Sequence, residues 1–198
     1  MKNTVILIIV SFLTWSLFFK TEESVRYGPG VLVPESPIQQ NQAFDRGILF
    51  KDYKITPLAH FSMRAKVLSK KNYYFGKEAD LSPTDLALGW GRMSDESILK
   101  SITISQSGRW YRWRASSLPI PKREIETHSA NMHIIPSNQM VADTLKRVRN
   151  GNLINLTGKL VRIDSSDGWH WTSSLTRNDR GQGACELILV EHMEIETI

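Results

Sequence analysis

The chain has 198 residues, of which 41% are hydrophobic and 23% are charged, a composition typical of folded globular proteins, so intrinsic disorder is not expected. Its formal net charge is +5, which allows an anionic partner such as a phospholipid, a nucleic acid or an acidic glycan without selecting among them. Cys185 is the single cysteine, so an intramolecular disulfide and a zinc site built from several thiolates are both excluded.

The first element is an uncharged, strongly apolar run of seventeen residues between Lys2 and Lys20. As a helix it would be about 25 Å long, which is at the short end of what crosses a bilayer. No small-x-small cleavage site follows the run, so we expect residues 1–20 to be kept as a membrane anchor. Cleavage as a signal peptide near Thr14-x-Ser16 is the alternative. The short charged N-terminus favours a single-pass protein of the bacterial inner membrane whose domain faces the periplasm or the cell exterior.

Residues 21–50 are predicted to form a tether. Prolines and glycines cluster between Tyr27 and Pro37, and amide side chains dominate residues 39–42. Because this composition disfavours helices and strands, we expect an extended linker without regular elements. Residues 51–198 then form a single globular domain of ordinary size.

Two elements are expected early in this domain. Over residues 55–74, apolar residues alternate with polar ones, which predicts an antiparallel strand with one buried face. Ser82 has the character of a helix N-cap and Pro83 that of a first helical residue. The pattern therefore predicts a helix that ends at Gly89 or Gly91.

The middle of the domain is predicted to contain a hairpin and a helix. Residues 101–104 and 109–114 have strand composition and flank a turn. A helix is expected to begin after Ser137 or Asn138 and to end at residues 150–151. The apolar residues that share its buried face are Val141, Leu145 and Val148.

The C-terminal third is predicted to be an antiparallel meander of residues 153–163, 169–175 and 184–193. Gly158 lies in the middle of the first of these strands, where it indicates a bulge or a bend. The expected fold class is α+β: a curved antiparallel sheet, or a small, partly open barrel of the OB type, with two or three helices. One N-terminal transmembrane helix is expected to precede it.

Three segments, residues 89–95, 129–136 (Ser-Ala-Asn-Met-His-Ile-Ile-Pro) and 181–186, resemble a family of short, membrane-anchored bacterial proteins. The resemblance covers most of the domain. It implies a bacterial setting, and it brings no activity, cofactor or catalytic residue with it.

The candidate catalytic residues are His133, Cys185 and Asn131. A thiol nucleophile needs a base within hydrogen-bond distance, and that base needs a partner that orients it. The alternative is that Cys185 is an inert thiol at the start of a buried strand and that His133 is a buried imidazole bonded to the backbone. His128 and His133 are five residues apart, which on a strand directs them to opposite faces. We therefore expect no metal site, and no cofactor is indicated.

Basic and aromatic residues alternate most densely in one stretch, and two further tryptophans follow later: Arg109, Trp110, Arg112, Trp113, Arg114, Trp169 and Trp171. Such side chains can stack on sugar or base rings while they pair with anionic groups. They are the candidate binding surface for an anionic glycan, a lipid headgroup or a nucleic acid, or for an envelope protein. The alternative is an edge strand whose aromatic face packs in the core while the arginines reach into solvent.

The sequence thus predicts a membrane-anchored extracytoplasmic binding or accessory domain. A structural role as a subunit of an envelope complex is a further possibility. The alternative is a hydrolase-type enzyme that uses His133 with Cys185 or an acidic residue. Ligand, partner and oligomeric state are left open.

Overall fold

The computed structural model describes residues 24–41, 46–176 and 185–197. The membrane anchor expected at residues 1–20 lies outside these ranges, and no helix within them is long and apolar enough to cross a membrane. In chain order the elements are β1 (Ile38–Asn41), β2 (Ile48–Phe50), β3 (Tyr53–Asn72), α2 (Lys77–Leu81), β4 (Thr84–Gly89), the 3₁₀ helix η1 (Gly91–Ser94), α3 (Glu96–Leu99), β5 (Thr103–Ser107), β6 (Trp110–Arg114), α4 (Lys122–Thr127), β7 (Ser129–Pro136), α5 (Gln139–Arg147), β8 (Leu153–Ser165), β9 (His170–Thr172) and β10 (Glu186–Ile195).

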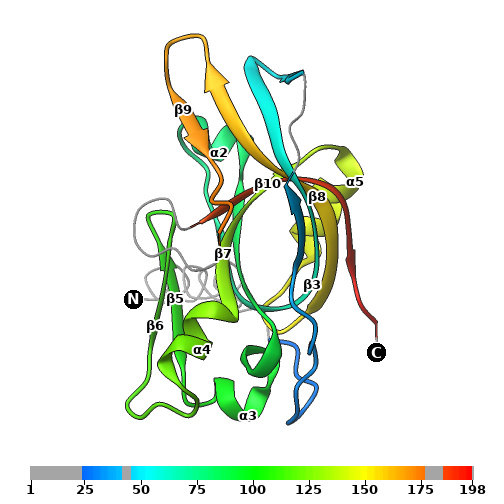
Figure 1. Cartoon of the computed structure of the whole chain (residues 1–198). Coiled ribbons are helices and arrows are strands. Elements are labelled where there is room, and N and C mark those ends of the chain that lie inside the picture. The colour runs from blue at the N-terminus through cyan, green and yellow to red at the C-terminus, as the bar shows by residue number, and fades with distance from the viewer. Residues whose placement is uncertain (1–23, 42–45, 177–184, 198) are drawn as a thin grey trace, which may run out of the picture.

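The strands of the main sheet curve into a ring (Figure 1). The strands pair in the order β3–β4–β7–β10–β8, and β8 also pairs with β3, which closes the ring. β7 and β10 run parallel, whereas the other neighbours in the ring run antiparallel. α5 connects β7 to β8 and packs against β10 and β7. The expected curved antiparallel sheet is confirmed, with one parallel pair that the sequence did not indicate.

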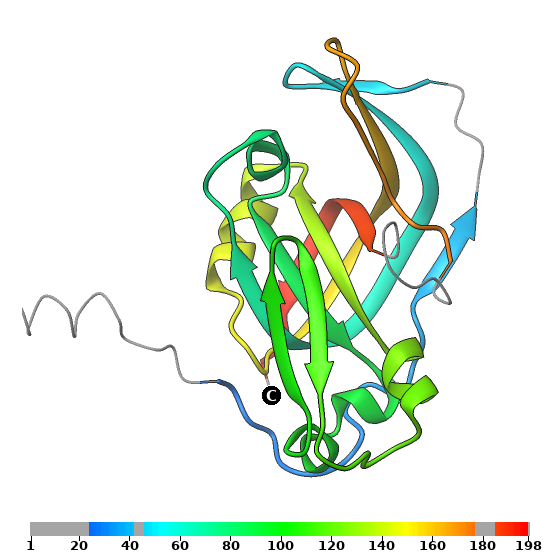
Figure 2. The same cartoon turned by 90° about the vertical axis from the view of Figure 1, so that its left-hand side faces the viewer.

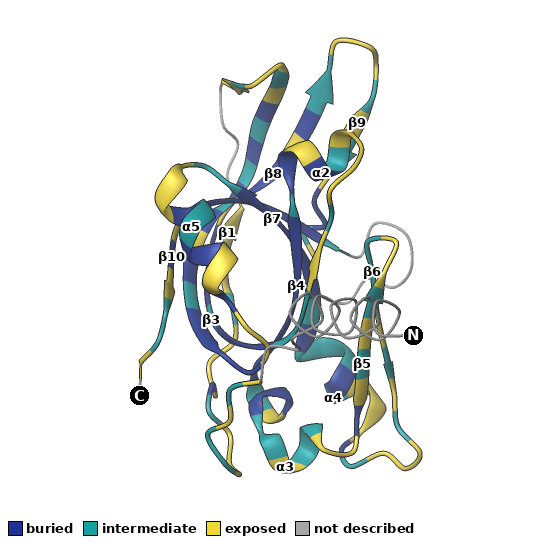
Figure 3. Cartoon of the chain, turned by 180° about the vertical axis from the view of Figure 1, so that it is seen from behind, coloured by how far each residue is buried: buried dark blue, intermediate teal, exposed yellow. Residues whose placement is uncertain are grey.

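The strands of the ring are largely buried (Figure 3), and their apolar side chains make up the main hydrophobic core. The apolar residues of β3 that alternate with polar ones are buried in it, as the period of two predicted. The predicted face of α5 joins the same core, since Val141, Leu145 and Val148 are each at most 2% exposed. The helix begins after Asn138, whose side-chain oxygen accepts a hydrogen bond from the backbone N–H of Val141 at 3.0 Å.

Gly158 lies at a close approach between β8 and β10. A Cβ atom at this position would lie 2.2 Å from the carbonyl oxygen of Leu189, so no larger residue fits without moving a strand. The β8–β10 register also shifts between Val190 and His192. The irregularity that the mid-strand glycine indicated is present as this shift in the pairing of β8 with β10.

The helix predicted from Ser82 to Gly89 or Gly91 is wrong. Ser82 is the C-cap of α2, and the residues after Pro83 form β4, in which every residue is buried. β4 pairs with β3 on one side and β7 on the other. Pairing on both edges and burial on both faces outweigh a local capping pattern, which is a weak determinant of structure.

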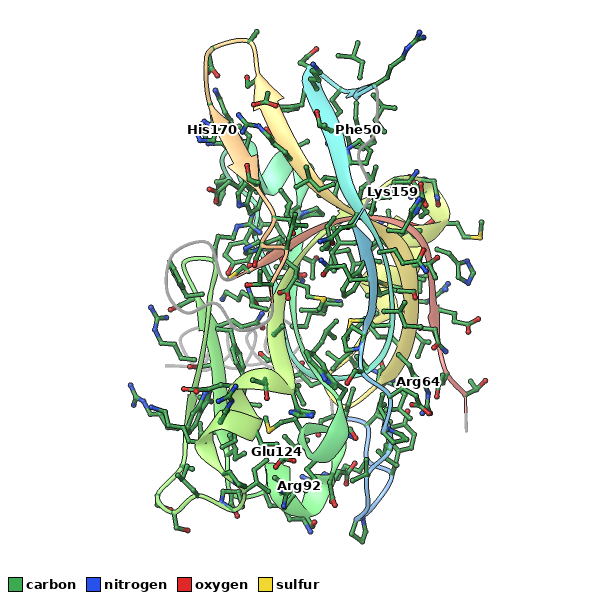
Figure 4. All side chains as sticks on the ribbon, in the orientation of Figure 1. Phe50, Arg64, Arg92, Glu124, Lys159 and His170 are labelled. Atoms are coloured by element: carbon green, nitrogen blue, oxygen red, sulfur yellow. The ribbon has the colours of Figure 1, made fainter. Side chains whose placement is uncertain are left out.

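The expected number of helices is also wrong, because the described residues contain four short α-helices and η1. Most of them lie in the long connection between β4 and β7, which also carries the separate two-stranded sheet of β5 and β6. Met93, Ile102, Ile120 and Ile125 form a core under this connection. An ion pair between Arg92 and Glu124 joins η1 to α4 (Figure 4).

The segment predicted to be a tether is held against the barrel and contains regular elements. β1 and β2 pair with β3, and Val33 is fully buried in the main core. The backbone N–H groups of Leu32 and Val33 both donate to the hydroxyl of Ser94 at 3.0 Å. The expectation of a linker free of strands is wrong here, because an unpaired edge of the long β3 was available to pair with it.

Candidate functional site

One outer face of the ring carries buried polar side chains. Asp85 on β4 and His133 on β7 are directly opposite each other, and they alternate with the core residues Leu86 and Met132. Because successive strand residues point to opposite faces, Asp85 and His133 point away from the barrel interior. Cys185 directly precedes β10, the next strand in the ring.

The hairpin of β5 and β6 lies over this face, in front of β4 and β7 in Figure 2. The hydroxyl of Tyr111 lies 3.0 Å from that of Ser129, and the side-chain amide of Gln106 lies 2.6 Å from that of Asn131. Burial under these contacts raises the pKa of Tyr111 to about 12, although its hydrogen bond with Ser129 opposes the shift. The hairpin thus forms an outer wall of the site.

Arg109 stands at the tip of the hairpin, with a backbone φ of 68° that few residues other than glycine adopt. Its backbone N–H donates to the hydroxyl of Tyr73 at 3.1 Å, and its guanidinium carbon lies 3.8 Å from the centre of that ring. The guanidinium donates to Oδ1 of Asp85 at 2.7 Å and lies 3.5 Å from a carboxylate oxygen of Glu78. Arg109 is therefore fixed by two carboxylates and one aromatic ring.

Burial and the nearby charge of Asp85 both raise the pKa of Tyr73, against the opposing effect of Arg109. Its phenol therefore stays protonated at neutral pH. A protonated hydroxyl can hold the tip of the hairpin without adding a third negative charge.

Asp85 and His133 are buried and incompletely hydrogen-bonded. Their side chains are 0% and 4% exposed, and Nδ1 of His133 lies 2.9 Å from Oδ1 of Asp85. The ring N–H is not directed at that oxygen, so neither Nδ1 nor Oδ2 of Asp85 has a hydrogen-bond partner among the described residues. Buried polar atoms without partners are uncommon in folded proteins and are frequent at functional sites.

A cavity of about 270 Å³ opens beside these groups, and it is lined by Glu78, Gly108, Arg109, Trp110, His133, Trp171, Thr172 and Cys185. The rings of His133 and Trp171 lie 4.7 Å apart, centre to centre. The guanidinium of Arg109 lies 5.7 Å from the ring of Trp171. The cavity therefore combines two indole rings with a cation, an imidazole and a carboxylate.

The three candidate catalytic residues lie on the same face, but they do not form the expected triad. Asn131 lies beside Cys185, at 3.9 Å from Nδ2 to Sγ, and donates to the carbonyl of Arg109 at 3.1 Å. The residue beside His133 is Asp85 instead. Burial raises the pKa of Cys185 to about 11, so the thiol stays protonated at neutral pH.

The candidate binding residues are divided among four places. Arg109, Trp110 and Trp171 line the cavity. Trp113 packs against the core beneath the connection, and Trp169 packs against a second core that includes β8 and β10 residues. Arg112 and Arg114 are exposed on β6 outside the cavity lining. β6 pairs with β5 and β9 with β8, so the two tryptophan-rich strands are not hydrogen-bonded neighbours.

Asp85, Glu78 and Tyr73 were not recognised as site residues from the sequence. Asp85 was assigned to the first turn of a helix that does not form. The available signal was an acidic residue directly before the apolar run Leu86-Ala87-Leu88, since a buried carboxylate requires a partner.

Within the described ranges, no group of three or more histidine, cysteine, aspartate or glutamate residues could hold a metal ion. Comparison of the chain with protein-family models, curated proteins and solved structures finds no match. The functional argument therefore depends on the site itself.

Proposed function

We propose that the chain is a membrane-anchored extracytoplasmic binding domain with an OB-type barrel, and that its cavity binds a small saccharide. The observation that carries this proposal is the cavity that Arg109, held by Asp85 and Glu78, lines together with the indole side chains of Trp110 and Trp171.

The strand order supports an OB-type barrel. In such barrels five strands close in a Greek key, and ligands bind on the face of the second and third strands and on the loops beside it. Here the second and third strands of the ring are β4 and β7, which carry Asp85 and His133. Glu78 comes from the connection between β3 and β4, the first and second barrel strands in chain order. Trp171 comes from the connection between β8 and β10, the fourth and fifth. The cavity thus occupies the position expected for a ligand.

The chemistry of the cavity favours a saccharide over a polyanion. The charge of Arg109 is balanced by Asp85 and Glu78, so little net positive charge is left to attract a phosphate backbone. Indole rings stack on the apolar faces of sugars, while the guanidinium, imidazole and carboxylate can bond hydroxyl groups. A cavity of about 270 Å³ has room for a ligand of one or two rings.

The proposed location follows from the apolar run of residues 3–19 and the absence of a cleavage site. A single-pass protein of the bacterial inner membrane would present the barrel to the periplasm or the cell exterior. Envelope glycans are present in that compartment, which makes them the saccharides of choice for a first test.

The test uses the full chain in detergent and isothermal titration with chitotriose, a muramyl dipeptide and a twelve-residue thymidylate. We expect a saccharide to bind, and Trp171→Ala to weaken binding by about tenfold or more because a stacking face is lost. The matched control is Arg112→Gln with Arg114→Gln, which changes charge outside the cavity and should leave saccharide binding unchanged. Thymidylate binding that the control variant abolishes would contradict the proposal.

A hydrolase-type enzyme is the second candidate, favoured by the 2.9 Å contact of His133 with the buried Asp85. In that function His133 would act as a general base and Asp85 would orient it, without a thiol nucleophile. Turnover of a bound saccharide by the wild-type chain, lost in His133→Ala while binding persists, would support it over simple binding.

A further inference from the structure

A second cavity, separate from the saccharide site, lies where the described chain begins. It has a volume of about 330 Å³, and its lining includes Val25, Arg26, Lys66, Glu96, Lys100 and Gly151. In Figure 2 the described chain enters at this edge, next to the loop between α5 and β8. The cavity has a partly apolar floor and a charged rim.

The chain is tightly held at this edge. The backbone N–H of Val25 donates to the carbonyl of Asn150 at 2.8 Å. A Cβ atom on Gly151 would lie 1.9 Å from the carbonyl oxygen of Val25, so only glycine permits this approach. The N–H of Tyr27 donates to Glu96, which also binds the ammonium of Lys66 at 3.0 Å. The first described residues are thus part of the barrel surface.

The length of chain before this edge limits its distance from the membrane. Lys20 ends the apolar run, and the five residues from there to Val25 can span at most about 17 Å. If the run is the anchor of the proposed function, the cavity must lie close to the headgroup layer.

The charges on this edge suit an anionic surface. Arg26, Lys100 and Arg149 are exposed, and no ion pair joins any of them to another residue in the part of the chain that the structure describes. The positive charge of Lys66 is already balanced by Glu96. Together with Lys20, the three free cations outnumber the two acidic residues at positions 22–23 of the connection.

We propose that this edge is a membrane-docking surface, with Arg26, Lys100 and Arg149 bound to the headgroups of anionic phospholipids. The proposal rests on the membrane attachment in the proposed function and is independent of the saccharide site. Basic residues near an anionic membrane each contribute about fivefold to the docking equilibrium, and salt weakens the effect.

The test uses the full chain in nanodiscs of phosphatidylcholine alone or with 30% phosphatidylglycerol, and follows hydrogen exchange of the backbone amides of residues 99–102 and 149–152. We expect slower exchange with phosphatidylglycerol, and loss of this difference in 0.5 M salt. Arg26→Gln with Lys100→Gln and Arg149→Gln should remove the difference as well. The matched control is Lys122→Gln with Arg123→Gln and Lys159→Gln, which neutralises three cations on other elements and should retain the difference in exchange.

Each contrary outcome has a separate meaning. Equal exchange in the two kinds of nanodisc, for a chain that floats with them, overturns the docking surface and leaves the anchor intact. A chain that does not float with the nanodiscs overturns both the docking surface and the anchor. If inorganic phosphate, added to the chain in phosphatidylcholine nanodiscs, slows hydrogen exchange as much as phosphatidylglycerol does, the edge is a small-anion site instead of a membrane surface. None of these results bears on saccharide binding.

Discussion

At the scale of single residues, Asp85 is the centre of the candidate site. Its carboxylate has no exposure to solvent, accepts a hydrogen bond from Arg109 and lies beside His133. A buried charge whose partner is removed is strongly destabilising, whereas the pair itself contributes little beyond its desolvation cost. Asp85 therefore fixes Arg109 at the tip of the hairpin.

We predict that Asp85→Asn lowers the free energy of unfolding by about 3 kcal/mol, because Arg109 then lacks its closest counter-charge in a buried site. Urea unfolding followed by circular dichroism measures this. Asp164→Asn is the control, since Asp164 pairs with Arg162 on the exposed surface and such pairs contribute little. Equal losses in the two variants would show that Asp85 is not the main counter-charge of Arg109.

Cys185 gives a pH-dependent prediction at the same scale. Burial raises the pKa of its thiol to about 11, from an ordinary value of 9.0, and alkylating reagents react with the thiolate alone. We expect iodoacetamide to label the folded chain much more slowly than the urea-unfolded chain at pH 8. Labelling of the folded chain should rise about tenfold per pH unit up to pH 10. Rapid labelling at pH 7 would favour the thiol enzyme.

The same raised pKa has a consequence for stability. The thiol's contribution is fully present below pH 9, where both states are protonated, and is lost as the pH rises toward 11, since only the unfolded chain has then released its proton. Cys185→Ser should reduce this loss between pH 9 and 11. Because Cys185 is the single cysteine, no other thiol contributes to the comparison.

At the scale of elements, α5 closes one side of the barrel core with Val141, Leu145 and Val148. We predict that Leu145→Ala costs about 2–5 kcal/mol of unfolding free energy, since the side chain is 2% exposed and its loss leaves a cavity. Met140→Ala on the same helix is the control. Met140 is 71% exposed, so its replacement should change stability by less than about 0.5 kcal/mol. Equal effects would mean that the other face of the helix is buried.

Elements with a clear period were predictable, and β4 shows why a local signature was not enough. The alternation in β3 and the cap and apolar spacing of α5 each describe one face of one element, which the chain itself encodes. The serine and proline before Thr84 also fit a helix start, but Leu86 and Leu88 are needed in the core between two neighbouring strands. Pairing with distant residues decided this segment.

At the scale of the whole molecule, the barrel is held to its N-terminal segment by Val25, Tyr27 and Val33. Residues 24–41 therefore form part of the folded domain instead of a free linker.

We predict that the mature protein keeps residues 1–20 and sediments with membranes, since the apolar run lacks a cleavage site. Fractionation followed by N-terminal sequencing measures this, with extraction by detergent but not by alkaline carbonate as the expected behaviour. Recovery of a soluble chain that begins after Ser16 or Phe19 would show that the run is a cleaved signal peptide.

The sequence by itself determined what depends on local patterns: the α+β class, the long alternating strand, the position of α5 and the irregular pairing at Gly158. It also identified Arg109, Trp110, Trp171, His133 and Cys185 as residues of interest, because the functional groups of their side chains can be read directly from the sequence. Only the tertiary structure decided that these residues share one cavity, and that Arg112 and Arg114 do not. The physical reason is that ring closure by β3 and β8, and the folding of the β5–β6 hairpin over β4 and β7, bring together residues far apart in the chain. No hydrophobic period or residue spacing in the sequence encodes such contacts. Asp85 becomes a site residue only through its contacts with Arg109 and His133.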